Sequence, residues 1–437
     1  MKNKKKHRNY TLSLLLILIT LLIAGGVTVW ALRNGNKPAA PADVFSDETT
    51  SEASEESSSP ESEEEQSTEP SETSDSSEET SEESSEEESE PEPEPTMAET
   101  MLSEMTLREK LCQLIIVMPH QITGVSNQTQ AGETSRQALE NYPVCGFIED
   151  ATNMVSQDQV TQMNENLQSY SKIPLLITLD EEGGRVARLM ANCGTTWFNS
   201  MLSYKDQGPE VARSNAATIA SDILSCGFNI DLAPVADVWS NPENSVIGDR
   251  AYSDDFDQAA ELVAAAVQGF HDGGTACTIK HFPGHGDTSA DSHLGAVYVY
   301  KSLEDIKANE LKPFKAGIEA GADCVMIGHL IITDVEDTPA LFSHTLVTDL
   351  LRGELGFDGV IMTDSLQMQA MSDYYSSGEV AVMALQAGVD ILLCPMDLDE
   401  TLSSLEAAID SGELTEERID ESVLRILSLK EKLGLLG

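Results

Sequence analysis

The sequence CTIKHFPGHGDT at residues 277–288 decides the fold, because a short apolar run passes directly into ionisable side chains. Similar apolar runs recur from about residue 110 onward, and eight are found: Leu111–Val117, Val144–Ile148, Pro174–Leu179, Phe228–Ala233, Cys277–Lys280, Cys324–His329, Gly359–Thr363 and Val389–Leu393. Amphipathic stretches lie between many of them: Pro209–Ser225, Phe256–His271, Leu303–Ala320, Leu346–Leu355 and Gly378–Ala387. Short buried runs that alternate with amphipathic helices are typical of a parallel sheet covered by helices.

Eight such units between residues 98 and 437 predict an α/β fold, the (β/α)8 TIM-type barrel, which commonly needs about 250 residues plus insertions. A doubly wound open sheet is the alternative, but its glycine fingerprint G-x-G-x-x-G is absent after the first run. The last stretch, Leu402–Leu435, predicts two helices separated by Ser411-Gly412.

Three segments precede this region and differ from it in composition. Residues 1–8 are basic, residues 9–32 are uncharged and long enough to cross a bilayer, and residues 33–97 are rich in Ser, Glu and Pro. The basic residues are expected to stay in the cytoplasm, and the polar segment to be a disordered linker. We therefore predict a transmembrane anchor in the cell membrane with residues 98–437 outside the cell, or a secreted protein if the apolar segment is cleaved.

The charge balance excludes nucleic acid as a partner. The 437 residues contain 26 Lys and Arg against 75 Asp and Glu, for a net charge of −49, and proteins bind phosphates mainly through Lys and Arg. The seven cysteines are scattered without a CxxC pair, so we expect free thiols rather than a disulfide framework.

Polar side chains follow five of the eight predicted strands. In a barrel, the chemistry lies just beyond the C-terminal ends of the strands, so these groups should share one face. The stretches concerned are Asp180–Arg188, Asp231–Asp237 with Gly248–Arg250 downstream, Lys280–Thr288 with Asp291–His293, Gly328-His329, and Thr363–Ser365.

Asp364 directly follows a predicted strand, so its carboxylate should point into the barrel mouth as a nucleophile, a general base or a metal ligand. Lys280 and His281 end the fifth run in the same way, and they either contact a ligand or form a hydrogen-bonded rim. The four-residue spacing of His281 and His285 suggests zinc, but Pro283 and the neighbouring glycines break the helix that this geometry requires. A metal-dependent hydrolase stays an alternative.

Asp291-Ser292-His293 lies in a loop rich in small and polar residues, where the carboxylate of Asp291 can reach the His293 ring. Such a pair fixes the imidazole tautomer and suits it to general acid and base catalysis near neutral pH. Together with Asp364, this pair indicates a two-step displacement of the kind used in retaining glycoside hydrolysis. Asp180, Arg188 and Arg250 would hydrogen-bond the hydroxyl or amide groups of the ligand.

The stretch from Lys280 to Thr288 with Asp291–His293 resembles the signature of the β-N-acetylglucosaminidases of glycoside hydrolase family 3. Matching stretches at Asp180–Arg188, Val246–Arg250 and Met362–Ser365 occur in the expected order, so the resemblance covers residues 98–437. It implies a (β/α)8-type barrel that removes terminal β-linked N-acetylglucosamine with retention and without a metal or cofactor.

By the same resemblance, the catalytic residues are Asp364 as nucleophile and His293 as proton donor, which Asp291 polarises. The sugar-binding positions are Asp180, Arg188, Arg250, Lys280 and His281. The anchor places the enzyme at the cell wall, so the expected carbohydrate substrate is peptidoglycan fragments that contain GlcNAc and MurNAc.

The chain departs from the family pattern at Glu181, where relatives usually have Gln, and this adds a carboxylate near the expected sugar site. The sequence ends at Gly437, so we expect the single-domain form. Some relatives with the same Asp-His pair transfer the sugar to phosphate, so a phosphorylase is an alternative. A non-catalytic glycan-binding surface protein is an alternative of another class.

Overall fold

An eight-stranded parallel sheet lies at the centre of the computed structural model, which describes residues 94–288 and 295–436. The order of its strands is β11-β9-β7-β6-β3-β2-β1-β12. The strands are β1 (Ile115–Val117), β2 (Gly146–Ile148), β3 (Leu176–Leu179), β6 (Ile230–Asp231), β7 (Ala276–Phe282), β9 (Cys324–Ile327), β11 (Val360–Thr363) and β12 (Leu392–Leu393). A parallel bridge between Met362 and Ile391 joins the two ends of the sheet. The sheet is therefore a barrel, and the predicted α/β architecture is confirmed.

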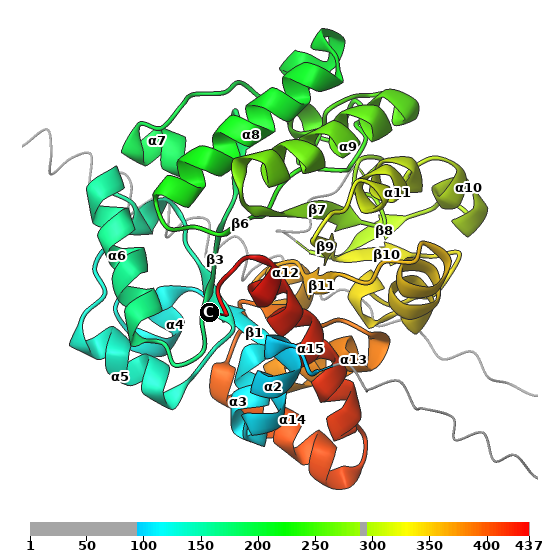
Figure 1. Ribbon diagram of the computed structural model, residues 1–437. Helices are drawn as coiled ribbons and strands as arrows, with labels where there is room; N and C mark the ends of the chain where they lie inside the picture. Colours follow the sequence, from blue (N-terminus) through cyan, green and yellow to red (C-terminus); the bar gives the residue numbers. More distant parts are fainter. Residues whose placement is uncertain (1–93, 289–294, 437) are drawn as a thin grey trace, which may run out of the picture. The chain divides into compact units, whose positions relative to one another are not determined.

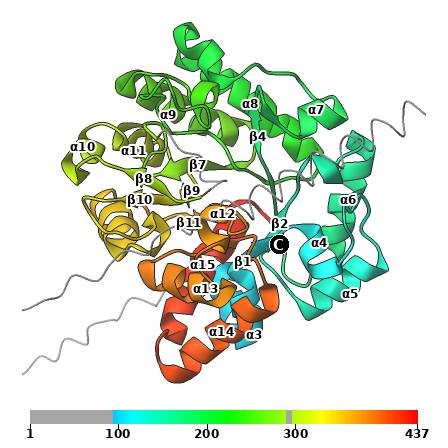
Figure 2. The ribbon, with the colours of Figure 1, turned by 180° about the vertical axis from the view of Figure 1, so that it is seen from behind.

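Helices surround these strands on the outside (Figures 1 and 2). The helices are α2 (Met97–Glu104), α3 (Leu107–Gln113), α4 (Pro119–Thr123), α5 (Glu133–Asn141), α6 (Gln157–Tyr170), α7 (Leu189–Cys193), α8 (Pro209–Ser225), α9 (Phe256–Gly273), α10 (Leu303–Ala308), α11 (Leu311–Glu319), α12 (Gln369–Ser372), α13 (Ser377–Ala387), α14 (Leu398–Ser411) and α15 (Glu416–Lys432). Helices α8 and α9 pack so closely that a Cβ on Gly269 would lie 2.2 Å from the Arg213 carbonyl oxygen.

Smaller elements extend the barrel beyond its main strands. Two short sheets are present, one of β4 (Glu181–Gly183) with β5 (Val186–Ala187) and one of β8 (Val297–Val299) with β10 (Leu330–Ile332). Single turns of 3-10 helix are η1 (Ala151–Asn153), η3 (Gly248–Arg250) and η4 (Ala340–Phe342), and η2 (Met201–Gln207) is longer. Because these elements follow β2, β3, β6, β7 and β9 in the chain, they build up the C-terminal end of the barrel.

The first apolar run is mostly not a strand, although Leu111–Val117 was expected to be one. Helix α3 includes Leu111 and Cys112, and β1 begins only at Ile115. A capping box starts this helix: Glu109 N–H donates to Thr106 Oγ1 (3.3 Å), and Thr106 N–H donates to Glu109 Oε2 (2.9 Å). The cap sets the helical period, and the apolar residues then fill its buried face.

The boundaries of two other helical stretches also differ from those predicted from the sequence. The stretch Leu303–Ala320 forms two helices, α10 and α11, which are separated at Asn309, and Leu346–Leu355 lies mostly in a π-helix, η5 (Thr345–Glu354). The two final helices, α14 and α15, are confirmed. Gly412 ends α14 with φ of 77°, a left-handed conformation that glycine adopts without steric cost. The seven cysteines are free, as expected.

The predicted basic segment 1–8, the predicted membrane segment 9–32 and the linker up to residue 93 lie outside the described residues. In residues 94–288 and 295–436, no helix is long and apolar enough to cross a membrane.

Candidate active site

A cavity of about 330 Å³ lies at the C-terminal ends of the barrel strands. Six side chains that the sequence indicated line it together: Asp180, Arg188, Arg250, Lys280, His281 and Asp364. They meet because the carboxyl ends of parallel strands converge at one end of a barrel. The other two candidates, Asp291 and His293, lie outside the described residues, and the roles of all eight residues stay predictions.

Five charged side chains form a network beside this cavity. Lys280 Nζ donates to Asp180 Oδ1 (2.6 Å) and lies 2.8 Å from Glu182 Oε1. Arg250 holds the same Glu182 carboxylate in bidentate fashion, with Nε and Nη2 each 2.8 Å from an oxygen. Arg188 Nη2 approaches Asp180 Oδ2 at 3.8 Å. Asp180 and Arg188 are partly exposed to the cavity, so they can offer an acceptor and donors to a ligand.

The network keeps Glu182 and Lys280 ionised although both side chains are almost fully buried. Burial by itself would raise the pKa of Glu182, but the charges of Arg250 and Lys280 outweigh it and hold that pKa well below its usual range. Burial would lower the pKa of Lys280, but the carboxylates of Asp180 and Glu182 raise it. The network therefore presents fixed charges that need no rearrangement when a ligand arrives.

Asp364 lies directly after β11, and its backbone N–H donates to the carbonyl oxygen of Ile327 (3.0 Å). The Ser365 N–H donates to Asp364 Oδ1 (2.7 Å). Burial would raise the pKa of Asp364, but the charges of His329 and His281 and the Ser365 N–H outweigh it and lower the pKa. The carboxylate is thus ionised at neutral pH, which is the form that a nucleophile requires.

His281 is oriented by Asp237, a buried residue that follows β6. Asp237 Oδ2 lies 2.6 Å from His281 Nδ1, and its Oδ1 accepts the backbone N–H groups of His281 (3.2 Å) and His285 (2.6 Å). Burial would raise the pKa of Asp237, but the neighbouring His281 lowers it. Since an ionised carboxylate only accepts hydrogen bonds, His281 Nδ1 carries a proton and donates it to Asp237.

Glu181 points away from the charged network, although the sequence suggested an extra carboxylate near the expected sugar site. Its Oε2 accepts the backbone N–H groups of Arg188 and Leu189 (2.7 Å each), and its Oε1 accepts that of Met190 (2.8 Å). Burial raises the pKa of Glu181 although these three donors oppose it. Glu181 therefore organises the start of α7 and does not line the cavity.

No role was predicted from the sequence for Glu182 or Asp237, although their carboxylates hold the side chains of Lys280, Arg250 and His281. Each stands in a polar stretch after a predicted strand, and that position was the available signal. Glu182 lies two residues after Asp180, and side chains at this spacing share one face of an extended chain. Because side chains alternate between the two faces of an extended chain, Glu182 and its neighbour Glu181 point in opposite directions.

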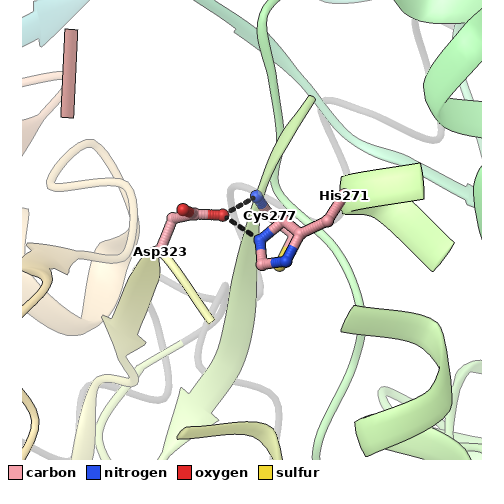
Figure 3. Close-up of side chains that lie close together, drawn as sticks. All are labelled: His271, Cys277 and Asp323. Carbon is pink, nitrogen blue, oxygen red and sulfur yellow. Dashed lines mark hydrogen bonds and ion pairs between the residues drawn. The ribbon is translucent and has the colours of Figure 1, made fainter. Parts of the chain in front are cut away.

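Among the described residues, one group of His, Cys and Asp side chains is close enough to share a metal ion, and it lies away from the cavity (Figure 3). They are His271, Cys277 and Asp323, with potential ligand atoms within 4.8 Å of one another, near the N-terminal ends of β7 and β9. Asp323 Oδ2 lies 2.9 Å from His271 Nε2 and accepts the Cys277 N–H (3.0 Å), and Lys432 Nζ donates to Oδ1 (2.6 Å). Burial would raise the pKa of Asp323, but His271 and Lys432 lower it. The cluster ties α9 and α15 to the strands.

The comparison with known families agrees with this geometry. The sequence matches the family described as "Glycosyl hydrolase family 3 N terminal domain" over residues 106–429. The chain belongs to glycoside hydrolase family 3. Within this family, the chain is 33% identical over 327 residues to beta-hexosaminidase A of Pseudoalteromonas piscicida, and the match covers 68% of this chain and 55% of the relative.

A beta-hexosaminidase of Xanthomonas oryzae pv. oryzae is 36% identical over 273 residues, which cover 61% of this chain and 80% of that protein. Among solved structures, the family 3 beta-N-acetylglucosaminidase of Paenibacillus sp. str. FPU-7 is similar with a TM-score of 0.72 and 38% identity, covering 76% of this chain and 63% of that one. The chain therefore spans about half the length of the Pseudoalteromonas relative and under two thirds of the Paenibacillus one.

Proposed function

We propose that this protein is a retaining exo-β-N-acetylglucosaminidase that hydrolyses terminal β-linked GlcNAc. The ionised Asp364 carboxylate carries the proposal, because it shares one cavity with Asp180, Lys280 and Arg250. The similar relatives named beta-hexosaminidase and beta-N-acetylglucosaminidase support this activity.

In the first step, the Asp364 carboxylate attacks the anomeric carbon and forms a glycosyl-enzyme ester while the bond to the leaving oxygen breaks. The sequence assigns protonation of that oxygen to His293, oriented by Asp291. In the second step, the neutral His293 takes a proton from water, the water oxygen attacks the anomeric carbon, and the Asp364 carboxylate is released. Asp180 and Arg188 would hold the sugar hydroxyl and acetamido groups throughout.

The proposed location is the outer side of the cell membrane, or the extracellular medium if the apolar segment is cleaved. The uncharged residues 9–32 and the acidic linker that follows them support an anchor and a spacer. At that location, the accessible β-linked GlcNAc would be that of peptidoglycan fragments with GlcNAc and MurNAc.

The test is release of p-nitrophenol from its β-N-acetylglucosaminide. Asp364→Ala and His293→Ala should each abolish release, because the first removes the nucleophile and the second the proton donor. Asp373→Ala is the matched control, since Asp373 is an exposed acid that does not line the cavity, and it should keep the wild-type rate. Wild-type rates in Asp364→Ala would contradict the proposal.

The same assay separates the alternatives. A rate that depends on phosphate, with GlcNAc 1-phosphate as product, would identify a phosphorylase. Loss of activity with a chelator would identify a metal-dependent hydrolase, and binding of the sugar without turnover would identify a glycan-binding protein.

A further inference from the structure

The cluster of His271, Cys277 and Asp323, near the N-terminal ends of β7 and β9, has the composition of a zinc site (Figure 3). Imidazole, thiolate and carboxylate groups all bind Zn²⁺ in proteins, and a thiolate selects Zn²⁺ against Mg²⁺ and Ca²⁺. The potential ligand atoms all lie within 4.8 Å of one another. A tetrahedral ion with bonds of about 2.0–2.3 Å needs ligand atoms roughly 3.3–3.6 Å apart, so side-chain shifts of about 1 Å would close the cluster around it.

The fold brings these three side chains together from a helix and two neighbouring strands. Cys277 belongs to β7 and Asp323 directly precedes β9, and the pairing of Thr278 with Cys324 places them side by side across the sheet. Side chains at corresponding positions of paired strands point to the same face. His271 lies in the last turn of α9, and the chain turns from there directly into β7. The backbone therefore holds the three residues in place before any ion binds, which lowers the entropy cost of binding.

One side of the cluster is buried, and the other side reaches solvent. Cys277 is fully buried and the Asp323 side chain is 1% exposed, whereas the His271 side chain is 31% exposed. A hollow of about 430 Å³ is lined by Asp323 and Lys432. An ion can therefore enter from this side, and a water molecule from the hollow can supply the fourth ligand beside the three protein ligands.

The contacts of the Asp323 carboxylate are compatible with a ligating role. Its Oδ2 accepts the backbone N–H of Cys277 (3.0 Å), and its Oδ1 accepts from Lys432 Nζ (2.6 Å). Hydrogen bonds of this kind orient a ligating carboxylate. The Lys432 side chain is 58% exposed, so its ammonium group can turn toward solvent when a cation arrives. Binding exchanges the 2.9 Å contact between His271 Nε2 and Asp323 Oδ2 for bonds to the ion.

We propose that His271, Cys277 and Asp323 bind one Zn²⁺ ion, which joins α9 to β7 and β9. The S–H bond of Cys277 breaks as the Zn–S bond forms, and the thiol proton passes to solvent. The site lies at the end of the barrel opposite the active-site cavity, so the ion stabilises the fold and takes no part in glycoside cleavage. The proposal is independent of the proposed function.

The test titrates the full chain, first freed of metal, with Co²⁺ and with Zn²⁺. One equivalent of Co²⁺ should give a thiolate-to-metal charge-transfer band in the near ultraviolet, and Zn²⁺ should remove the band by displacing Co²⁺. Cys277→Ser should lose the band, and both Cys277→Ser and His271→Gln should bind Zn²⁺ at least about 100-fold more weakly. Cys193→Ser is the matched control, because Cys193 is a partly exposed free cysteine of α7 outside the cluster, and it should bind as the wild type does.

The thermal unfolding midpoint gives an independent measurement. Saturating Zn²⁺ should raise the midpoint of the wild type and of Cys193→Ser by several degrees and leave that of Cys277→Ser unchanged. Absence of the band in the wild type, or its persistence in Cys277→Ser, would overturn the proposal. If Cys277→Ser does not fold, His271→Gln decides, and a Zn²⁺ affinity equal to that of the wild type would overturn the proposal. A loss of kcat/KM with chelator that Zn²⁺ restores equally in the wild type and Cys277→Ser would place the metal elsewhere and overturn it too.

Discussion

Replacement of Glu182 by Gln removes one negative charge from the centre of the active-site network. The Glu182 side chain is 1% exposed, and three donor atoms approach its carboxylate: Arg250 Nε and Nη2 and Lys280 Nζ, each at 2.8 Å. A Gln side chain has nearly the same shape, but it keeps only one acceptor oxygen and turns an NH2 group toward a cation. Lys280, itself 2% exposed, would keep only Asp180 as a counter-charge.

The loss of unfolding free energy expected for Glu182→Gln follows from this burial. Loss of one partner from a buried ion pair typically costs about 3–5 kcal/mol, because the remaining charge is left without full compensation. With total stabilities of about 5–15 kcal/mol, Glu182→Gln should be folded but clearly less stable than the wild type. We also expect kcat/KM to fall roughly 100-fold, since Lys280 and Arg250 line the cavity and lose their common anchor.

The free energy of unfolding is measured in urea, and kcat/KM with the p-nitrophenyl substrate. The matched control is Glu181→Gln, the same substitution at the adjacent residue, which is equally buried but accepts only backbone N–H groups. It should cost about 1–2 kcal/mol, because one of its three hydrogen bonds to backbone N–H groups is lost. Its kcat/KM should stay near that of the wild type.

The pH dependence of the free energy of unfolding gives a second measurement on Glu182→Gln. The folded-state pKa of Glu182 lies below its unfolded value, so its stabilising contribution is complete above about pH 5 and is lost as the pH falls. The stability difference between wild type and Glu182→Gln should therefore shrink in acid. A difference that does not change between pH 7 and pH 3, or equal losses of kcat/KM in the two Gln variants, would refute the reasoning.

Two further substitutions separate the two ends of the barrel. Asp237→Asn should lower kcat/KM about tenfold or more, because an amide can present its NH2 group to His281 Nδ1 and disturb the ring's orientation; an unchanged pH–rate profile would count against this role. Asp323→Asn should lower the free energy of unfolding by about 2–3 kcal/mol with KM unchanged, because Asp323 lies at the N-terminal end of the strands. The pKa of Asp323 is lowered, so this loss of unfolding free energy should be full at neutral pH and should diminish as the pH falls below about 4. A changed KM would contradict the structural role of Asp323.

The barrel and the composition of its mouth were predictable from the sequence for a definite reason. Strands of a parallel barrel are buried on both faces, so each appears as a short continuous apolar run, and the polar residue at its end marks the mouth. This reasoning identified Asp180, Lys280 and Asp364 although up to 184 positions separate them in the chain. It failed at Leu111–Val117, because a short apolar run has the same appearance in a buried helix face and in a strand.

By itself, the sequence determined the alternation of strands and helices, and therefore which polar residues follow a strand. Only the tertiary structure decided what each of these residues contacts. Glu181 and Glu182 are identical in chemistry and adjacent in the chain, yet one caps α7 and the other holds Lys280 and Arg250. The physical reason is that side-chain direction alternates along an extended segment, while the partners come from strands and loops about 68 and 98 residues further on. The charge of a residue is encoded locally, but its partner, its burial and its pKa depend on packing between distant segments.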